Sequence, residues 1–209
     1  MNTSSTNVYQ PQDIYTLEKL ALQTQKIPAR SLMERAAKAA LQYLQELWPQ
    51  AKTIGIVCGR GNNGGDGYAL ALLAQQAGYT VFVGHEGADI TSKEPAAFYQ
   101  KACQHSAVKH FPLGQTTWPK TDVWVDALLG IGLARDVEGL YRTAIRKLNE
   151  QATPILSLDC PSGLDSTHGR VWGIAVEAFA TITFIGLKVG LLTGVAPSYC
   201  GYLRCDTLG

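Results

Sequence analysis

The sequence predicts an α/β domain in which a mainly parallel β-sheet is covered by helices on both faces, with a helical extension before the first strand. From residue 53 onward, short apolar runs alternate with helical patterns, which is typical of parallel strands joined by crossover helices. The 209 residues show no internal repeat and no Pro- or Ser-rich linker, and this length suits one domain. We therefore expect a flexible N-terminus over residues 1–10 and a single domain over residues 11–209.

Two helices are expected before the first strand. Pro11 suits the first turn of a helix, and apolar residues then recur at helical spacing. A longer helix from Ala29 to Trp48 carries an apolar stripe formed by Met33, Ala36, Ala37, Ala40, Leu44 and Leu47. Both helices should pack outside the sheet or against another subunit, and the pattern favours this packing role over a catalytic one.

The remaining elements follow from short apolar runs, read as strands, and from longer amphipathic segments, read as helices. The expected strands are Thr53–Cys58, Thr80–Gly84, Val108–Phe111, Asp122–Asp126, Pro154–Leu158 and Ala180–Ile185. The expected helices lie near Asp66–Ala77, Ser92–His105 and Leu140–Glu150, with a short one around Trp172–Phe179.

Charge and composition exclude several classes of protein. Lys and Arg number 18 against 17 Asp and Glu, so no large net field attracts nucleic acid or an acidic membrane. The longest uncharged stretch, Val189 to Leu203, is shorter than the roughly 20 residues of a membrane span and contains glycine and proline. The N-terminus lacks the pattern of a secretory signal, and the five cysteines lack metal-binding spacing. We expect a cytoplasmic protein with a small-molecule partner.

The first glycine cluster, Gly59-Arg60-Gly61-Asn62-Asn63-Gly64-Gly65-Asp66-Gly67, follows a strand and precedes a helix. Glycines bring backbone N–H groups close to a ligand, and a helix N-terminus favours an anion such as a pyrophosphate. The asparagines and Asp66 add oxygens that suit a hard cation or sugar hydroxyls. A tight strand-to-helix turn with asparagine in left-handed positions is the structural alternative.

Two further polar clusters follow later strands. Val125-Asp126-Ala127-Leu128-Leu129-Gly130-Ile131-Gly132 places Asp126 at a strand end, where it could bind a ligand or cap the following loop. Arg135 could pair with a phosphate or with Asp136. In Leu158-Asp159-Cys160-Pro161-Ser162-Gly163, Pro161 stiffens the turn that presents Ser162. Because right-handed crossovers bring the carboxyl ends of parallel strands to one edge, the three clusters should form one site.

These motifs resemble a known family. GNNGGDG at 61–67, VDALLGIGL at 125–133, LDCPSGLD at 158–165 and TFIGLKVGL at 183–191 look like the YjeF-type N-terminal domain of NAD(P)H-hydrate epimerases, as does SLMERAA at 31–37. The resemblance extends from about Ile14 to Gly209 and implies a three-layer αβα Rossmann-like sandwich, usually a homodimer. It also leaves open a fused or separate ADP- or ATP-dependent dehydratase, with this chain as the N-terminal half of a bifunctional protein.

The resemblance also implies a function and a set of site residues. The expected activity is the interconversion of the R and S forms, at C6, of hydrated NADH or NADPH (NADHX and NADPHX) for cofactor repair. Asp159 would be the catalytic carboxyl and Lys188 matches a recurrent family lysine, whereas Asp136 departs from the proline that the family commonly has there. A potassium ion would be held by oxygens of Asn63, Asp126 and Ser162. The substrate-binding residues would be Asn62, Asn63, Gly64, Gly65, Asp66, Gly130, Ile131, Gly132, Leu133, Ala134, Arg135, Asp136 and Asp159.

Three other functions remain open from the sequence. The spacing of Gly59, Gly61 and Gly64, with Glu86 after the next strand, also fits an NAD-dependent dehydrogenase, although one domain leaves little room for a substrate domain. A non-catalytic nucleotide-binding or scaffold module of the same fold is a second alternative. A serine triad using Ser162 and His168 is disfavoured because no G-x-S-x-G elbow is present.

Overall fold

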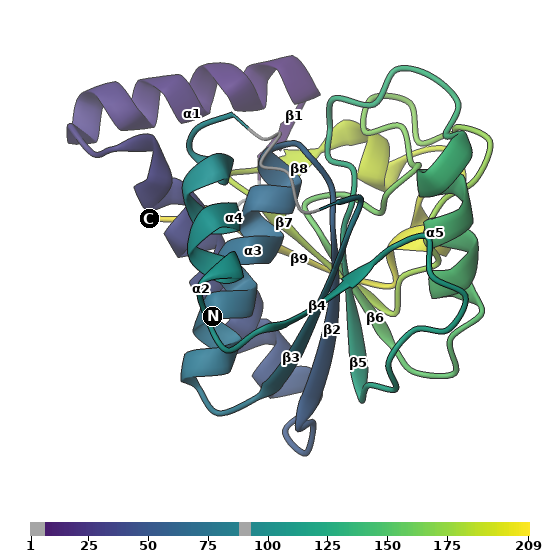
Figure 1. The fold of residues 1–209 in the computed structure, drawn as a ribbon. Helices are drawn as coiled ribbons and strands as arrows, with labels where there is room; N and C mark the ends of the chain where they lie inside the picture. Colours follow the sequence, from purple (N-terminus) through teal and green to yellow (C-terminus); the bar gives the residue numbers. More distant parts are fainter. Residues whose placement is uncertain (1–6, 88–92) are drawn as a thin grey trace.

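The computed structural model describes residues 7–87 and 93–209. Figure 1 shows a sheet flanked by helices on both faces, which confirms the predicted α/β class. Its strands and helices, in chain order, are β1 (Val8–Tyr9), α1 (Pro11–Gln25), α2 (Ala29–Leu47), β2 (Thr53–Cys58), α3 (Asn62–Gln76), β3 (Thr80–His85), α4 (Ala96–Gln104), β4 (Lys109–Pro112), β5 (Val123–Ala127), α5 (Gly139–Asn149), β6 (Ile155–Leu158), β7 (Ala180–Phe184), β8 (Leu187–Lys188), the 3₁₀ turn η1 (Val189–Leu192), α6 (Pro197–Cys200) and β9 (Tyr202–Asp206).

The main sheet has seven strands in the order β4-β3-β2-β5-β6-β7-β9, and every neighbouring pair is parallel. The chain reverses its direction of progress across the sheet between β2 and β5. In open parallel sheets, ligands bind in the crevice outside the carboxyl ends of the strands at such a reversal. The topology therefore places a binding site beside the loops that follow β2 and β5.

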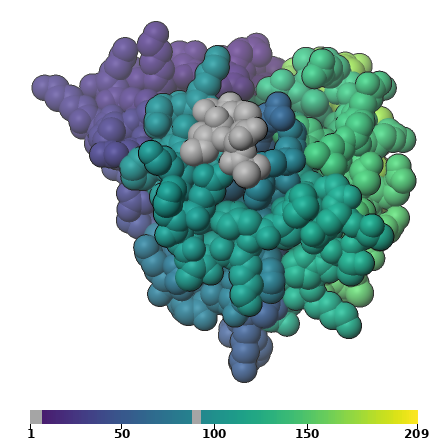
Figure 2. Space-filling view, viewed as in Figure 1, coloured from purple at the N-terminus to yellow at the C-terminus, as the bar shows by residue number. Residues whose placement is uncertain are grey.

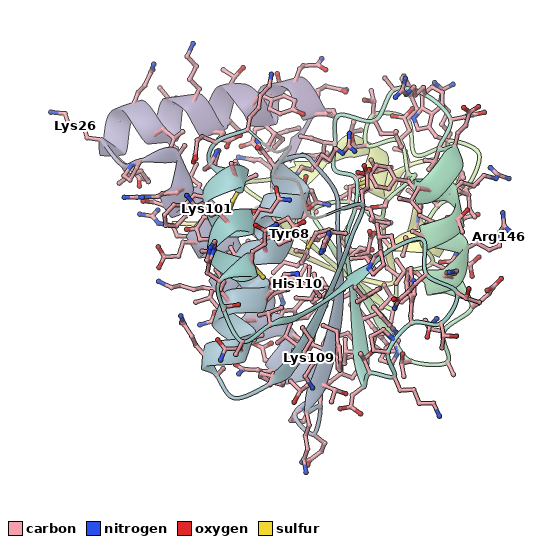
Figure 3. The ribbon with its side chains drawn as sticks, viewed as in Figure 1. Lys26, Tyr68, Lys101, Lys109, His110 and Arg146 are labelled. Atoms are coloured by element: carbon pink, nitrogen blue, oxygen red, sulfur yellow. The ribbon has the colours of Figure 1, made fainter. Side chains whose placement is uncertain are left out.

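Two apolar cores hold the layers together. The larger one packs α2, α3 and α4 on one face of the sheet, and the other packs α5 on the opposite face. Tyr68 of α3 is 2% exposed and points into the interior, whereas Lys101 of α4 and Arg146 of α5 project outward from opposite sides in Figure 3. Helix α1 lies across the end of the sheet where the strands finish (Figure 1).

Most predicted elements are confirmed to within a few residues, but one helix is wrong. The segment Trp172–Phe179 is irregular rather than helical, because most of its amides find partners far away in the chain. Val176 N donates to Ser162 O, and Ala178 N donates to Tyr199 O. These long-range bonds replace the local bonds that a helix would make.

Several boundaries also differ from the sequence prediction. Helix α3 begins at Asn62 rather than near Asp66, so Asn62 to Gly65 belong to its first turns. Helix α4 begins at Ala96, and its predicted start at Ser92 lies outside the described residues. In the segment expected to be flexible, residues 1–6 also lie outside them, whereas Val8–Tyr9 pair with β8. Strands β1, β8 and β9 were not predicted.

Candidate functional site

The glycine-rich turn joins β2 to α3 by close backbone contacts. A Cβ on Gly64 would lie 1.9 Å from the carbonyl oxygen of Gly59, so a side chain at residue 64 would collide with backbone. The first hydrogen bond within α3 runs from Gly65 N to Gly61 O. The amides just before Gly65 therefore have no acceptor within the helix, which leaves them available to an anion at the helix N-terminus.

Gly65 has a packing role that the sequence did not suggest. A Cβ there would lie within 3 Å of Met33 on α2 and of Ala96 on α4, so Gly65 permits helix packing. The cleft wall in this region is instead formed by Asn62, Asn63 and Asp66. Gly64 and Gly65 shape the turn and the helix contacts behind this wall, and their expected part in substrate binding stays a prediction.

Asp126 is fully buried at the end of β5 and is the centre of a hydrogen-bond network. Its carboxylate accepts the hydroxyls of Ser157 and Ser162 at 2.9 and 2.6 Å. It also accepts the amides of Ser162 and Leu128 at 2.8 and 3.2 Å. Burial raises the pKa of Asp126, and the bonds from Ser162 oppose that rise. Asp126 therefore joins the loop after β5 to the loop after β6 through hydrogen bonds, which is the capping role that the sequence allowed.

Two of the three residues expected to bind a cation, Asn63 and Ser162, contact Leu129, and Asp126 is hydrogen-bonded to Ser162. Asn63 Nδ2 donates to Leu129 O at 2.9 Å, and Leu129 N donates to Ser162 Oγ at 2.8 Å. The Leu129 carbonyl can only accept, which fixes the orientation of the Asn63 amide. Asn63 Oδ1 is then a buried oxygen without a hydrogen-bond partner among the residues that the structure describes. A buried acceptor left in this way is costly, and a hard cation would satisfy it.

Asp159 follows β6 and has a positive φ of 64°. Its side chain is 16% exposed, and its Oδ1 lies 2.5 Å from Lys188 Nζ. Lys188 is fully buried and also donates to Thr183 Oγ1 and to Phe184 O, each at 2.8 Å. An ammonium group has three hydrogens, so Lys188 is saturated and holds the Asp159 carboxylate in place. The role of Lys188 was not assigned from the sequence.

Asn63 and Asp159 border a cleft of about 1010 Å³ outside the carboxyl ends of the strands, whereas Asp126, Ser162 and Lys188 are not among its lining residues. Of the predicted site residues, its walls include Asn62, Asn63, Asp66, Gly130, Ile131, Gly132, Leu133, Ala134, Arg135, Asp136 and Asp159. Helix α1 supplies another wall through Tyr15 and Glu18, although it was expected only to pack. In Figure 2, the N-terminal helices in purple and the green second half of the chain occupy opposite sides of the visible face.

Carboxyl groups are concentrated at one end of the cleft. Burial raises the pKa of Glu18, and the charge of Asp159 raises it further while Lys188 opposes the rise. Burial raises the pKa of Asp66 well above its usual range, with added contributions from Asp159 and Glu18. Asp159, paired with Lys188, thus lies near two carboxyl groups whose raised pKa values favour the neutral form.

The other end of the cleft carries a second ion pair. Arg60, from the glycine-rich turn, contacts Glu86, which follows β3. Both residues line the cleft, and so does Tyr141 of α5. Burial, together with Glu86, raises the pKa of the Tyr141 hydroxyl. The two ends of the cleft therefore differ in chemistry.

The serine triad is not assembled. The Ser162 hydroxyl bonds to Asp126, whereas the His168 ring lies 3.0 Å from Asp165 and its side chain is 71% exposed. Among the described residues, no cluster of three or more His, Cys, Asp or Glu side chains could hold a metal ion. Nor does any helix in the described part of the chain have the length and apolarity to cross a membrane.

Comparison with known proteins agrees with this architecture. The family model described as YjeF-related protein N-terminus matches residues 29–190. The NAD(P)H-hydrate epimerase of Legionella pneumophila (strain Philadelphia 1) is 33% identical over 210 residues, covering 97% of this chain and 78% of that protein. The chain belongs to the family of YjeF-related N-terminal domains, which confirms the resemblance inferred from its motifs.

Longer relatives and a solved structure add to this picture. The bifunctional NAD(P)H-hydrate repair enzymes Nnr of Coxiella burnetii and Escherichia coli K12 are 43% and 37% identical. The chain is covered over 98% and 97% of its length in these alignments, yet it spans only 42% and 39% of those two proteins. The crystal structure of yeast ynu0, YNL200c, superposes with a TM-score of 0.76 at 21% identity, covering 88% of this chain and 82% of the yeast chain. The likeness to the yeast protein concerns the fold.

Proposed function

We propose that this protein is an NAD(P)H-hydrate epimerase, an isomerase that interconverts the R and S forms of NADHX and NADPHX at C6. The observation that carries the proposal is the Asp159 carboxyl, which is held by the buried Lys188 and lines a dinucleotide-sized cleft beside the N-terminus of α3. Relatives named for this activity, such as the Legionella enzyme, align over nearly the whole chain.

The substrate should lie across the reversal point of the sheet. Its pyrophosphate would meet the N-terminus of α3, as in dinucleotide-binding folds. Glu86 follows β3 and would then face the adenosine ribose, while Asp159 follows β6 and would face the hydrated nicotinamide ring. This orientation places the adenosine ribose at the end of the cleft with the Arg60–Glu86 ion pair, and the nicotinamide ring at the end with the carboxyl groups.

The chemistry requires proton transfer at one oxygen atom. At C6 the hydroxyl and the ring nitrogen N1 share a carbon, so the N1 lone pair can form a C6=N1 double bond as the C–O bond breaks. A proton supplied to the departing oxygen makes it water. When water returns to C6, the π electrons go back to nitrogen and a carboxylate takes the extra proton. Asp159, fixed by Lys188, would exchange that proton and stabilise the transient ring cation.

A potassium ion is also proposed, with oxygen ligands from Asn63, Asp126 and Ser162. The unpartnered Asn63 Oδ1 and the fully buried Asp126 carboxylate support a hard monovalent cation. When bound, the cation would supply positive charge beside the substrate phosphates and hold the loops after β5 and β6 together. Replacing potassium by tetramethylammonium should lower both the epimerisation rate and the melting temperature. Unchanged values of both would remove the ion from the proposal.

The proposal also covers the location, the oligomeric state and the partner of the enzyme. We infer a cytoplasmic homodimer that works with a dehydratase, either fused or separate. Exposed aromatic side chains at the β9 edge, Phe179 at 47% and Tyr202 at 67%, offer apolar surface for self-association. Light scattering should then give twice the 22.6 kDa mass of the chain.

The activity can be tested with a mixture of R and S hydrates and an S-specific dehydratase. The dehydratase alone should consume only the S form, and adding this protein should bring conversion to completion. If the R form persists, the proposed activity is wrong. Absorbance at 340 nm with this protein, NAD⁺ and candidate substrates tests the dehydrogenase alternative, since a dehydrogenase would form NADH whereas epimerisation transfers no hydride.

A further inference from the structure

Helix α1 closes the cleft over the expected position of the nicotinamide ring. A Cβ built on Gly132 would lie 3.4 Å from the Tyr15 hydroxyl, so α1 reaches the loop after β5. Glu18 lies one helical turn after Tyr15 and lines the same cleft. The family model matches from residue 29 onward, so α1 lies outside the matched range.

Glu18 and Asp159 approach the cleft from different walls. Asp159 extends from the sheet edge after β6, while Glu18 comes from the helix that lies across that edge (Figure 1). A flat ring held between the helix and the sheet edge presents one face to each. An epimerase needs this arrangement, because hydroxide leaves from one face of C6 and water must add to the other.

The two carboxyl groups also lie in different electrostatic environments. The Asp159 carboxyl is held by the Lys188 ammonium group, with Oδ1 2.5 Å from Nζ. Glu18 is half-buried, and burial together with the Asp159 charge raises its pKa, which favours the form that can donate a proton. The charged and titratable groups that face Glu18 are Asp159, Lys188, Asp66 and Tyr15.

We propose that Glu18 is a second proton-transfer residue, acting on the face of the ring opposite Asp159; this rests on the proposed epimerase function. In one direction Glu18 gives a proton to the departing hydroxyl, the C6–O bond breaks, and the N1 lone pair forms C6=N1. Water then adds from the Asp159 side, the π pair returns to N1, and Asp159 takes the proton. The reverse reaction starts from the enzyme form with the two protonation states exchanged, so atoms and charge balance.

The test compares Glu18→Gln, Glu18→Asp and a matched surface control, Glu34→Gln. Glu34 lies on α2, 48% exposed, in an i,i+4 ion pair with Lys38. Glu18→Gln should lower kcat for epimer exchange by about 10²-fold, the usual scale for acid–base catalysis, with KM changed little. Glu18→Asp should recover part of the loss, and Glu34→Gln should match the wild type. Melting temperatures of all variants check that α1 stays folded.

The pH profile distinguishes proton transfer from a structural role. Because Glu18 must be protonated to donate, the wild-type rate above the uncatalysed background should fall at alkaline pH. Glu18→Gln should lose this alkaline limb. Near-wild-type kcat, an effect on KM alone, or an unchanged alkaline limb would overturn the proposal, as would loss of that limb in Asp66→Asn instead. A wild-type protein without epimer exchange would instead refute the proposed function itself.

Discussion

At the scale of single residues, Asp159 combines an unusual backbone with an ion pair. A positive φ is uncommon outside glycine, and Asp and Asn tolerate it better than most residues. The conformation directs the carboxylate to Lys188, which is fully buried. Backbone strain of this kind is often found at functional sites, and here it coincides with the group that the proposed chemistry needs.

Asp159→Asn therefore tests whether the charge of this side chain is required, because its size is kept. Asparagine keeps the side-chain size and tolerates the positive φ, but it cannot accept the proton and leaves Lys188 without its anion. We expect the epimerisation rate to fall by about 10²-fold or more, with a smaller change in KM. Steady-state rates in the coupled dehydratase assay measure this. A rate close to that of the wild type would refute the role of Asp159.

At the scale of elements, the turn between β2 and α3 depends on a close backbone approach. Gly64→Ala would place a Cβ 1.9 Å from the Gly59 carbonyl oxygen, and neither backbone atom can move without displacing the helix. We expect destabilisation of about 1–3 kcal/mol, the usual cost of overpacking, measured by urea unfolding.

Gly61→Ala is the matched control for this turn. Gly61 has a negative φ of −88°, and nothing lies within 4 Å of a Cβ placed there. Its substitution should change the free energy of unfolding by about 0.5 kcal/mol or less, as at other open surface positions. Equal destabilisation by both substitutions would mean that the collision between a Cβ at residue 64 and the Gly59 carbonyl oxygen is not the cause of the lost stability.

The starts of β2 and β5 are joined by one carboxylate. Asp122 Oδ2 accepts the amides of Lys52 and Thr53 and the Thr53 hydroxyl, each at 2.8 Å. The Lys52 amide, followed by the Thr53 groups, lowers the pKa of Asp122 below its usual value. A carboxyl with a lowered folded-state pKa stabilises the protein above its unfolded pKa of about 3.9 and loses that contribution as pH falls through the folded value.

Asp122→Ala should therefore lower the melting temperature at pH 7 by a few degrees. The difference from the wild type should shrink as pH is lowered from about 5 toward 3, because protonation removes the same interaction from the wild type. Thermal unfolding monitored by circular dichroism across this range measures the effect. A difference that stays constant with pH would show that the carboxylate charge does not contribute.

Elements were predictable where the signal is local. Buried parallel strands such as β2 and β5 are short apolar runs in the sequence, so their bounds could be predicted closely from the sequence alone. The segment Trp172–Phe179 was misread because its hydrogen-bond partners are distant in sequence. Strand β9 was missed because Arg204 and Asp206 interrupt its apolar pattern at the sheet edge.

Within the site, the polar loops were predictable, but their partners were not. Each loop follows a strand, so topology alone gathers Asn63, Asp126 and Asp159 at one edge. The lysine within TFIGLKVGL was a usable signal, since a lysine among apolar residues needs a buried anion. Glu18 gave no such signal, because only the tertiary position of α1 brings it to the cleft.

At the scale of the whole molecule, the proposed orientation of the substrate separates binding from chemistry. Glu86 follows β3 and Asp159 follows β6, and β2 and β5 lie between these two strands. A substrate that spans this distance touches the two residues with opposite ends. Changes at one end should therefore affect affinity, and changes at the other should affect the rate of the chemical step.

Glu86→Gln tests this division. If the Glu86 carboxylate accepts a hydrogen bond from the 2′-hydroxyl of NADHX, its loss should raise KM about tenfold, since bonds to charged groups contribute roughly 1.5–3 kcal/mol. The kcat value should stay unchanged because Asp159 is untouched. For NADPHX the 2′-phosphate is repelled by the carboxylate, so KM should remain level or fall. Parallel KM measurements with both hydrates check this, and a fall in kcat with unchanged KM would reverse the assigned orientation of the substrate.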